Sequence, residues 1–383
     1  MEPDFERFIK VLWGEEPDRV PFYEHLVDNE VIEAIIGEPV PALLEPGVPR
    51  SGEASKADSV KEGFVNCLLR FYKGLGYDYV PLELPLNLPR TNIRLGKDPA
   101  PLSRGTRTWV DENRGTIEKR EDFESYPWPD SEDLVEYDVL ERMCKILPEN
   151  MKLVSGVAGG VLEHALWLMG LRPFSIALFR DPKLIESMFD RIGSMIVEVD
   201  RHIAENNRVG AMRMGDDMAY KSGTMISPEN LRKYVFPWQK RCVEIAHSHR
   251  KPFILHSCGN LRRVIDDLID YVGIDAWHSF QDNIMPVTEA KEKYGHRVAL
   301  LGGVDVDKLS RLPVAELEAY TRVILEKCMP GGGYALGSGN SITNYMKIEN
   351  YKAMLKIGTK HGKYPKKVKL TKNIKHSCFD IKI

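Results

Sequence analysis

The sequence predicts an α/β protein whose parallel sheet closes into a (β/α)8 barrel of the TIM type. From residue 152 onward, apolar strand patterns alternate with amphipathic helix patterns and are joined by short connections. That order is typical of a parallel sheet. The strand patterns are nearly continuous apolar runs, as expected when both faces of a sheet are buried. With one strand pattern at 77–85, seven are visible in the whole chain, and an eighth can escape recognition. No Gly-x-Gly-x-x-Gly motif follows a first strand, which disfavours a Rossmann fold.

We expect residues 1–383 to form one domain, in which an N-terminal helical extension at 1–76 precedes the first strand. The extension begins with a short amphipathic helix at 5–12 and ends with a helical stripe of apolar residues at 61–75. A glycine follows this stripe as a C-cap. The first strand covers 77–85 and carries Glu83 near its C-terminal end.

An insertion at 86–150 separates the first strand from the regular part of the chain. It contains proline-rich and charged loops. We expect a hairpin that pairs 107–110 with 115–119, and a helix near 134–147. We expect the whole insertion to cap one mouth of the barrel.

The regular part of the chain supplies the remaining strands and helices. Its strands are expected at 152–158, 210–217, 251–258, 275–280, 297–303 and 333–339. Its helices are expected at 163–169, 181–206, 227–249, 261–271, 286–294, 306–329 and 347–360. In a parallel barrel the C-terminal ends of all strands meet at one mouth, so chemistry is expected there.

Composition excludes several classes of function. A net charge of −3 and a pI of about 6.4 give no basic surface of the kind that binds nucleic acid. The lysine-rich end at 363–375 is predicted to be a solvated tail. No apolar run approaches the roughly 18 residues of a membrane span, and the acidic N-terminus lacks the apolar part of a signal peptide. Six cysteines are scattered without a CxxC pair, so we expect a reduced, cytoplasmic protein.

The segment 251–260 ends a buried strand with two side chains that can hold a metal. Four apolar or aromatic residues run into His256 and Cys258, and Gly259 then breaks the run. Residues two apart on a strand face the same side, so this imidazole and thiol can point at one common atom. Such a pair is typical of zinc sites. The alternative is a buried histidine and a buried cysteine that merely finish the strand.

Other strand ends also carry polar or charged side chains, and a barrel brings them all to one mouth. A catalytic zinc needs a third protein ligand and keeps one position open. The residue types leave four competitors for that third position, and they are Glu83, Glu163, Asp217 and His278.

Most of these residues also have a purely structural interpretation. Glu163 can stabilise a helix N-terminus through its charge, and His278 can be a hydrogen-bonded core histidine. Asp216 and Asp217 are adjacent, so only one of them is expected to face the barrel axis. Asp305 is best explained as the N-cap of the next helix.

The motifs, taken together, resemble the uroporphyrinogen decarboxylase superfamily. Within it they are most similar to the branch of cobamide-dependent methyltransferases, such as methylcobamide:coenzyme M methyltransferases and O-demethylase methyltransferases. The resemblance extends over nearly the whole chain and implies a (β/α)8 barrel. The matching segments are 18–22, 215–223 with 227–229, 256–259, 302–305 and 333–339.

Two departures from the family patterns restrict what the resemblance implies. Decarboxylases of the family carry an arginine-rich N-terminal motif that grips substrate carboxylates, whereas the residues after Pro21 read Phe-Tyr-Glu-His, without arginine. They also tend to have histidine where this chain has Ser338, and the coenzyme M methyltransferases have a cysteine there as the third zinc ligand. Tetrapyrrole decarboxylation is therefore disfavoured. Either a carboxylate or a histidine replaces the missing cysteine ligand, or the metal is weakly bound or absent.

The resemblance implies a zinc-dependent methyltransferase that works with a corrinoid (cobamide) carried by a partner protein docked over the barrel mouth. Because the third cysteine is missing, we favour transfer of a methyl group from a small methylated substrate to the corrinoid, rather than from the corrinoid to a thiol. The residues assigned on this basis are His256, Cys258 and Glu163 for the metal, Asp217, Glu163 and His278 for catalysis, and Ser338 and Tyr220 for the cofactor.

Two other functions stay open at this point. One is a metal-free decarboxylase or lyase that acts on a small acid through the strand-end carboxylates. The other is a non-catalytic protein that binds a corrinoid or tetrapyrrole and has lost its metal site. Metal content separates these possibilities from a zinc methyltransferase.

Overall fold

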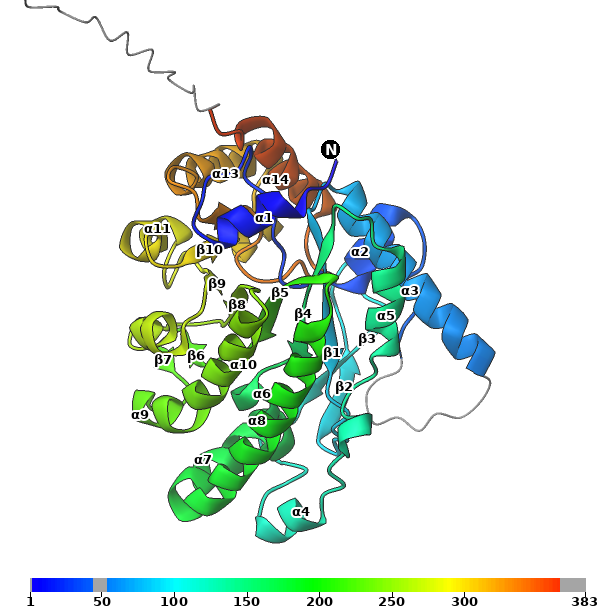
Figure 1. Cartoon of the computed structure of the whole chain (residues 1–383), viewed down its shortest axis with the longest axis vertical. Helices are drawn as coiled ribbons and strands as arrows, with labels where there is room; N and C mark the ends of the chain where they lie inside the picture. The colour runs from blue at the N-terminus through cyan, green and yellow to red at the C-terminus, as the bar shows by residue number, and fades with distance from the viewer. Residues whose placement is uncertain (1, 44–53, 366–383) are drawn as a thin grey trace, which may run out of the picture.

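Parallel strands form the centre of the molecule, as the sequence predicts. The computed structural model describes residues 2–43 and 54–365. Among these residues, seven strands form one curled parallel sheet in the order β1-β4-β5-β8-β9-β10-β11, which is consistent with a TIM-type barrel (Figure 1). Their bounds are β1 Tyr79–Pro85, β4 Lys152–Ala158, β5 Val209–Gly215, β8 Phe253–His256, β9 Ala276–His278, β10 Ala299–Leu301 and β11 Tyr334–Ala335.

The N-terminal segment that follows the first helix runs between the last and the first strand of this sheet. Phe22 bridges Leu336 in the parallel sense, and the Tyr23 amide donates to the Leu336 carbonyl oxygen at 2.8 Å. On the other side, the Glu24 amide donates to the Tyr79 hydroxyl of β1 at 3.0 Å. The segment therefore lies where an eighth strand of a barrel belongs.

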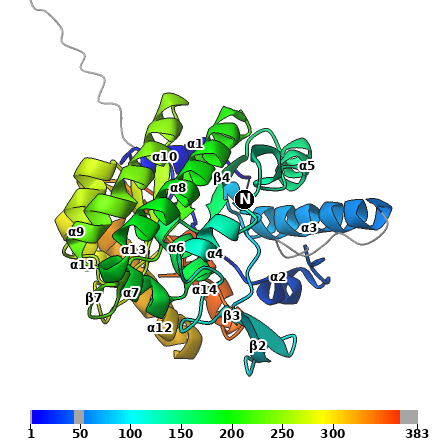
Figure 2. The ribbon, with the colours of Figure 1, turned by 90° about the horizontal axis from the view of Figure 1, so that it is seen from below.

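Helices surround the sheet, and Figure 2 shows α3 projecting away from this body. The helices up to β4 are α1 Phe5–Leu12, α2 Asn29–Ile36, α3 Ala54–Gly74, α4 Arg120–Ser125, the 3-10 turn η1 Ser131–Asp133 and α5 Asp138–Ile146. Those up to β8 are α6 Val161–Met169, α7 Leu171–Arg180, α8 Pro182–Glu205, α9 Pro228–Asn230, the π-turn η2 Leu231–Val235 and α10 Phe236–Ser248. Those after β8 are the π-turn η3 Asp267–Val272, α11 Val287–Tyr294, α12 Val306–Arg311, α13 Val314–Cys328 and α14 Ile348–His361.

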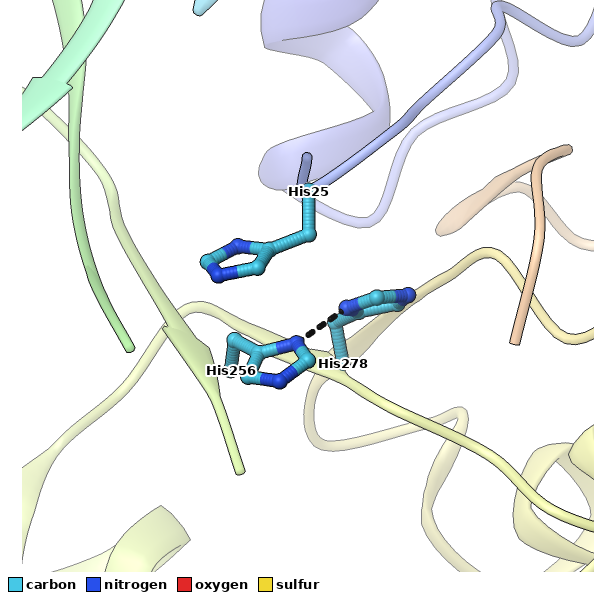
Figure 3. A group of neighbouring side chains, drawn as sticks. All are labelled: His25, His256 and His278. Carbon is cyan, nitrogen blue, oxygen red and sulfur yellow. Dashed lines mark hydrogen bonds between the residues drawn. The ribbon is translucent and has the colours of Figure 1, made fainter. Parts of the chain in front are cut away.

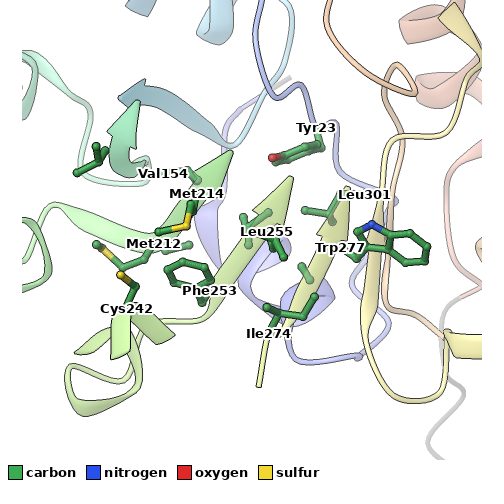
Figure 4. Close-up of a cluster of buried hydrophobic side chains, with 14 of the residues drawn as sticks. Tyr23, Val154, Met212, Met214, Cys242, Phe253, Leu255, Ile274, Trp277 and Leu301 are labelled. Carbon is green, nitrogen blue, oxygen red and sulfur yellow. The ribbon is translucent and has the colours of Figure 1, made fainter. Parts of the chain in front are cut away.

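The core fills the space between strands and helices. Helix α8 packs against β4 and β5, and α10 packs against β8. Figure 4 shows part of this core, with Met212 of β5, Phe253 and Leu255 of β8, and Cys242 of α10, all fully buried. Burying one such side chain contributes about 1.5–3 kcal/mol. This packing holds the strands in register and so fixes the positions of their C-terminal ends.

The hairpin within residues 86–150 differs from the predicted one. Strand β3, Thr106–Val110, pairs with the upstream strand β2, Ile93–Lys97, and not with 115–119. The downstream residues are used elsewhere, because the amides of Thr116 and Ile117 both donate to the carbonyl oxygen of Leu168. Those bonds tie the segment to the end of α6 and leave β3 free to pair upstream.

Other predicted bounds also need correction. The helix expected at 306–329 is broken at Pro313, which has no amide hydrogen and disfavours helical backbone at the residue before it. The helix expected at 261–271 is reduced to the π-turn η3, and α7 lies where no helix is predicted. The lysine-rich end, from residue 366 on, lies outside the described residues.

A search of the described helices for a membrane span finds none that combines the necessary length with sufficient apolar character.

The buried Asp200 carboxyl of α8 predicts how stability depends on pH. Asp200 is 1% exposed, and burial raises its pKa to about 7, whereas an unfolded aspartate titrates near about 3.9. The unfolded chain therefore loses this proton first as the pH rises, so stability falls between about pH 4 and pH 7. Asp200→Asn removes this loss, and we expect the variant to gain up to about 4 kcal/mol over wild type on going from pH 4 to pH 8.

Urea unfolding at several pH values measures this effect. Asp190→Asn, at an exposed position of the same helix, is the matched control and should differ from wild type equally at every pH. A difference between Asp200→Asn and wild type that does not change with pH contradicts the prediction.

Candidate metal centre

The end of β8 brings an imidazole and a thiol together, as its sequence predicts. His256 Nε2 lies 3.4 Å from Cys258 Sγ and 3.5 Å from Asp217 Oδ1. The Cys258 amide donates to the same Asp217 oxygen at 2.7 Å. Gly259 makes the turn possible, because its φ is +87° and a Cβ there would lie 2.2 Å from the Ala219 carbonyl oxygen. The three side chains form a group whose ligand atoms all lie within 4.8 Å of one another.

A chain of hydrogen bonds settles which nitrogen of His256 is available to a metal. His278 Nε2 lies 3.1 Å from the Ser338 carbonyl oxygen, which can only accept, so this nitrogen carries the hydrogen. Burial lowers the pKa of His278 well below its usual value, so the ring is neutral and its Nδ1 is an acceptor. That atom lies 2.7 Å from His256 Nδ1, as Figure 3 shows, and therefore receives its hydrogen.

The consequence is a lone pair on His256 Nε2, the nitrogen that faces Cys258 and Asp217. Burial lowers the pKa of His256 to about 3, so this ring also stays neutral. Metal-binding histidines regularly donate their other ring N–H to an acceptor that fixes the tautomer in this way. Ligand atoms of a tetrahedral zinc lie roughly 3.4–3.6 Å apart at the usual bond lengths, close to the separations found here.

The surroundings of the Cys258 sulfur also suit a cation. Burial, followed by the charge of Asp217, raises the pKa of the Cys258 thiol. The side-chain amide of Asn340 donates to the sulfur at 3.0 Å, and the Ser279 hydroxyl lies 3.7 Å from it. The Cys258 thiolate and the Asp217 carboxylate together would place two negative charges next to each other. A bound cation balances them and deprotonates the thiol.

A third histidine, His25, comes from the N-terminal segment and stacks on His256. The ring centroids are 3.9 Å apart and the planes are 10° from parallel, an arrangement visible in Figure 3. His25, His256 and His278 form a second group of potential ligands that shares His256 with the first. Burial lowers the pKa of His25 well below its usual value, and its Nδ1 is buried without a hydrogen-bond partner among the described residues.

The adjacent carboxylates after β5 have separate roles, as expected for neighbours on an extended chain. Asp216 turns away from the centre and accepts from the amides of Leu162 and Glu163 at 3.1 and 3.0 Å, which caps the start of α6. Gln239 donates to its other oxygen at 2.9 Å. Burial raises the pKa of Asp216 to about 6. Asp217 is the carboxylate that meets His256 and Cys258.

Glu163, predicted as the third ligand, borders the centre without belonging to either group of potential ligands. A Cβ at Gly215 would lie 3.2 Å from His25 Nε2 and 4.0 Å from Glu163 Oε2, so both side chains approach the same point of β5. Burial, with the charges of Asp217 and Asp216, raises the pKa of Glu163 well above its usual value. Its role as ligand or catalyst stays a prediction.

Ser338, where coenzyme M methyltransferases have a cysteine ligand, is buried and engaged with Glu24. Its hydroxyl donates to one Glu24 oxygen and its amide donates to the other at 3.0 Å. Burial raises the pKa of Glu24 to about 8. Tyr220 stands on β6, Ala219–Tyr220, and is about half exposed. The predicted cofactor contacts of Ser338 and Tyr220 stay untested.

The remaining strand-end candidates hold the site together. Glu83 of β1 accepts from the guanidinium of Arg213 of β5 at 2.7 and 2.8 Å. The same guanidinium donates to the carbonyl oxygen of His25 at 2.6 Å, which ties the N-terminal segment to the sheet. Asp305 caps α12 by accepting from the amides of Asp307 and Lys308, as its sequence context predicts.

Sequence reasoning missed Glu24, His25 and Asn340 as parts of this centre. A usable signal existed for the first two, because Val20–Tyr23 is an apolar run and both residues follow its end. That is the pattern by which His256 and Cys258 are recognised. Asn340 offers no local signal, since its contact with Cys258 spans 82 residues.

Comparison with known proteins agrees with this architecture. The family model described as Uroporphyrinogen decarboxylase (URO-D) matches residues 112–361, well over half of the chain. The chain belongs to the uroporphyrinogen decarboxylase family. This confirms the resemblance predicted from the sequence motifs. A search of curated proteins gives no match.

Two solved structures resemble this chain to different degrees. A methyltransferase from Methanosarcina mazei is 19% identical, with a TM-score of 0.66, and the match covers 92% of this chain and 97% of that one. A putative vitamin-B12-independent methionine synthase from Listeria monocytogenes is 10% identical, with a TM-score of 0.47, and the match covers 94% and 98% of the two chains.

Proposed function

We propose that this protein is a zinc-dependent methyltransferase that moves a methyl group between a small methylated substrate, or a thiol, and a corrinoid on a partner protein. The observation that carries the proposal is the convergence of His256 Nε2, Cys258 Sγ and Asp217 Oδ1 at a strand-end mouth. Membership of the family and a fold shared with a methyltransferase support it.

His256, Cys258 and Asp217 would hold the zinc in this proposal. Zinc supplies Lewis acidity there, either to keep a bound thiol as thiolate or to polarise a methylated heteroatom. His278 holds His256 in the tautomer with a free Nε2 lone pair, and Asn340 orients the sulfur. Glu163, whose pKa is raised, can offer a proton or a hydrogen bond to a substrate beside the centre.

The finer organisation of the chain belongs to the same proposal. We take 1–76 as an N-terminal extension of a single barrel domain and 86–150 as an insertion that caps its mouth. The corrinoid protein would dock over that mouth, in the cytoplasm. The position of the β2–β3 hairpin, which lines a cavity together with Asp217, supports the capping role.

Metal analysis of the wild-type protein tests the proposal first. After expression with added zinc, we expect about one zinc per chain, as for a three-ligand catalytic site. Methyl transfer is then followed by the cobalt absorption spectrum, with free methylcobalamin and a thiol in one direction and cob(I)alamin and a methylated compound in the other. A protein that stays metal-free under these conditions overturns the proposal and favours a metal-free lyase. Bound zinc with spectral changes but no transfer identifies a non-catalytic corrinoid binder.

The choice of carboxylate ligand predicts a difference between two variants. Asp217→Asn is expected to weaken zinc binding by at least about tenfold, because Asp217 belongs to the group that contains His256 and Cys258. Glu163→Gln is expected to stay within about twofold of wild type, because Glu163 lies outside that group. Zinc affinity is measured by competition with a chromophoric chelator. If Glu163→Gln weakened zinc binding more than Asp217→Asn, the ligand role would belong to Glu163.

The hydrogen bond between His256 and His278 predicts that His278 affects zinc affinity without binding the metal itself. His278→Ala removes the acceptor that holds His256 in its tautomer, and we expect a loss of about 10–100-fold in zinc affinity. His278→Gln, whose carbonyl oxygen can accept the same hydrogen, should restore part of this loss. His249→Ala, at an exposed position after α10, is the control. Folded His278→Ala protein with wild-type affinity for zinc contradicts the argument.

A further inference from the structure

A cavity of about 680 Å³ opens beside the candidate metal centre. The hairpin β2–β3 forms one wall, α6 forms another, and β6 completes it. Figure 1 shows this hairpin standing at the edge of the barrel near α6. Asp217, which approaches His256, lines the cavity as well. A ligand in this space would therefore extend from the metal centre toward solvent.

Three aromatic side chains contribute to the walls of the cavity. Trp109 of β3, Trp167 of α6 and Tyr220 of β6 all line it. Trp109 is about half exposed, and its indole lies across Gly96, where a Cβ would be 2.3 Å from the ring. Gly96 thus lets the ring rest against the hairpin. Trp167 is fixed in turn, because a Cβ at Gly159 would lie 2.4 Å from its ring.

Carboxylates outnumber cations among the lining residues. Glu112, Glu163 and Asp217 face one guanidinium, that of Arg90, which lies 5.3 Å from the Trp167 ring centroid. When Asp217 holds zinc, the Glu112 carboxylate still lines the cavity together with Trp109 and Tyr220. Burial, followed by the charge of the Glu112 carboxylate, raises the pKa of the Tyr220 hydroxyl. Acidic and aromatic groups therefore share the same walls.

Aromatic faces and carboxylates in one cavity select a particular class of ligand. Ring faces are negative and attract cations that shed water easily, and quaternary ammonium groups are bound by proteins in this way. Ammonium ions that hold their water tightly gain less from such walls. We propose that this cavity binds a methylated onium compound, a quaternary ammonium or tertiary sulfonium on a small organic body, as the methyl donor.

The inference rests on the proposed function, because a methyl donor is needed only by a protein that transfers methyl groups. When an onium centre gives up a methyl group, the carbon–nitrogen or carbon–sulfur bond breaks and the heteroatom keeps the electron pair. It leaves as a neutral amine or sulfide. The corrinoid of the partner protein accepts the methyl group in its Co(I) state and becomes methyl-Co(III). No proton has to be supplied, so a donor of this kind makes a smaller demand on the metal centre than an ether does.

Choline and 3,3-dimethylbutan-1-ol provide a matched pair of probes, because they share one shape and differ in charge. Titration followed by tryptophan fluorescence, or by calorimetry, needs neither corrinoid nor partner. We expect choline to bind at least roughly tenfold more tightly than the alcohol. Trp109→Ala and Glu112→Gln should each weaken choline binding several-fold, and Trp109→Phe should retain it. Trp13→Ala, at an exposed position after α1, is the control.

Equal affinity for the two probes overturns the inference, as does unchanged choline binding in both Trp109→Ala and Glu112→Gln. Tighter binding of benzoate than of choline also overturns it and points to an anionic ligand at Arg90. These results are distinguishable from failure of the proposed function. Zinc binding and methyl transfer without onium binding contradict only the inference. Onium binding in a protein that takes up no zinc contradicts only the proposed function.

Discussion

Replacing Cys258 with alanine is expected to abolish zinc binding and methyl transfer. The Cys258 sulfur lies 3.4 Å from His256 Nε2, and its removal leaves an imidazole and a carboxylate, too few ligands for a catalytic zinc. Lewis-acid stabilisation is worth several kcal/mol, so we expect methyl transfer to fall on the order of a thousand-fold. Zinc content by elemental analysis and the rate of change of the cobalt spectrum measure the two effects.

Cys328→Ala is the matched control, because Cys328 is also a free cysteine but is buried at the end of α13, away from the strand ends. It is expected to lose some stability and to keep its zinc. Full zinc content and activity in Cys258→Ala would be incompatible with the proposed centre. They would favour a metal-free lyase that works through the carboxylates.

Replacing Arg213 with methionine is expected to cost about 3–5 kcal/mol of folding stability, the loss typical of breaking a buried ion pair from one side. Arg213 is 2% exposed and joins two strands and the N-terminal segment through Glu83 and the His25 carbonyl oxygen. Its removal leaves the Glu83 carboxylate without its cation in a largely buried place. Urea unfolding, followed by circular dichroism, gives the change in stability.

A double-mutant cycle shows whether the pair accounts for this loss. The double variant Arg213→Met, Glu83→Gln should lose less stability than the two single variants lose in sum, because it contains no unpaired charge. The surface pair of Arg232 and Asp267 is the control, and Arg232→Met should lose less than about 1 kcal/mol. An equally small loss in Arg213→Met would mean that water solvates the freed carboxylate.

Local sequence patterns were sufficient to predict much of the framework. Strand β4 and helix α1 have the predicted bounds, because an apolar run and an amphipathic period are properties of neighbouring residues. The pair His256 and Cys258 was equally local, since residues two apart at a strand end face one side. The predicted hairpin partner of β3 was wrong. Strand pairing depends on the other hydrogen-bond partners that the backbone of each segment can find, and here 116–117 bond to the end of α6.

The sequence by itself determined the parallel α/β architecture, the family, and the placing of His256 and Cys258 side by side at a strand end. Only the tertiary structure decided which carboxylate meets His256, which of its nitrogens is free, and that His25 joins the centre. Ligand distances depend on the curl and register of the whole sheet. They also depend on contacts between distant segments, such as the bond from the Ser338 amide to Glu24, 314 residues away. No local pattern encodes such a contact, because it forms only when the N-terminal segment lies beside the segment that follows β11.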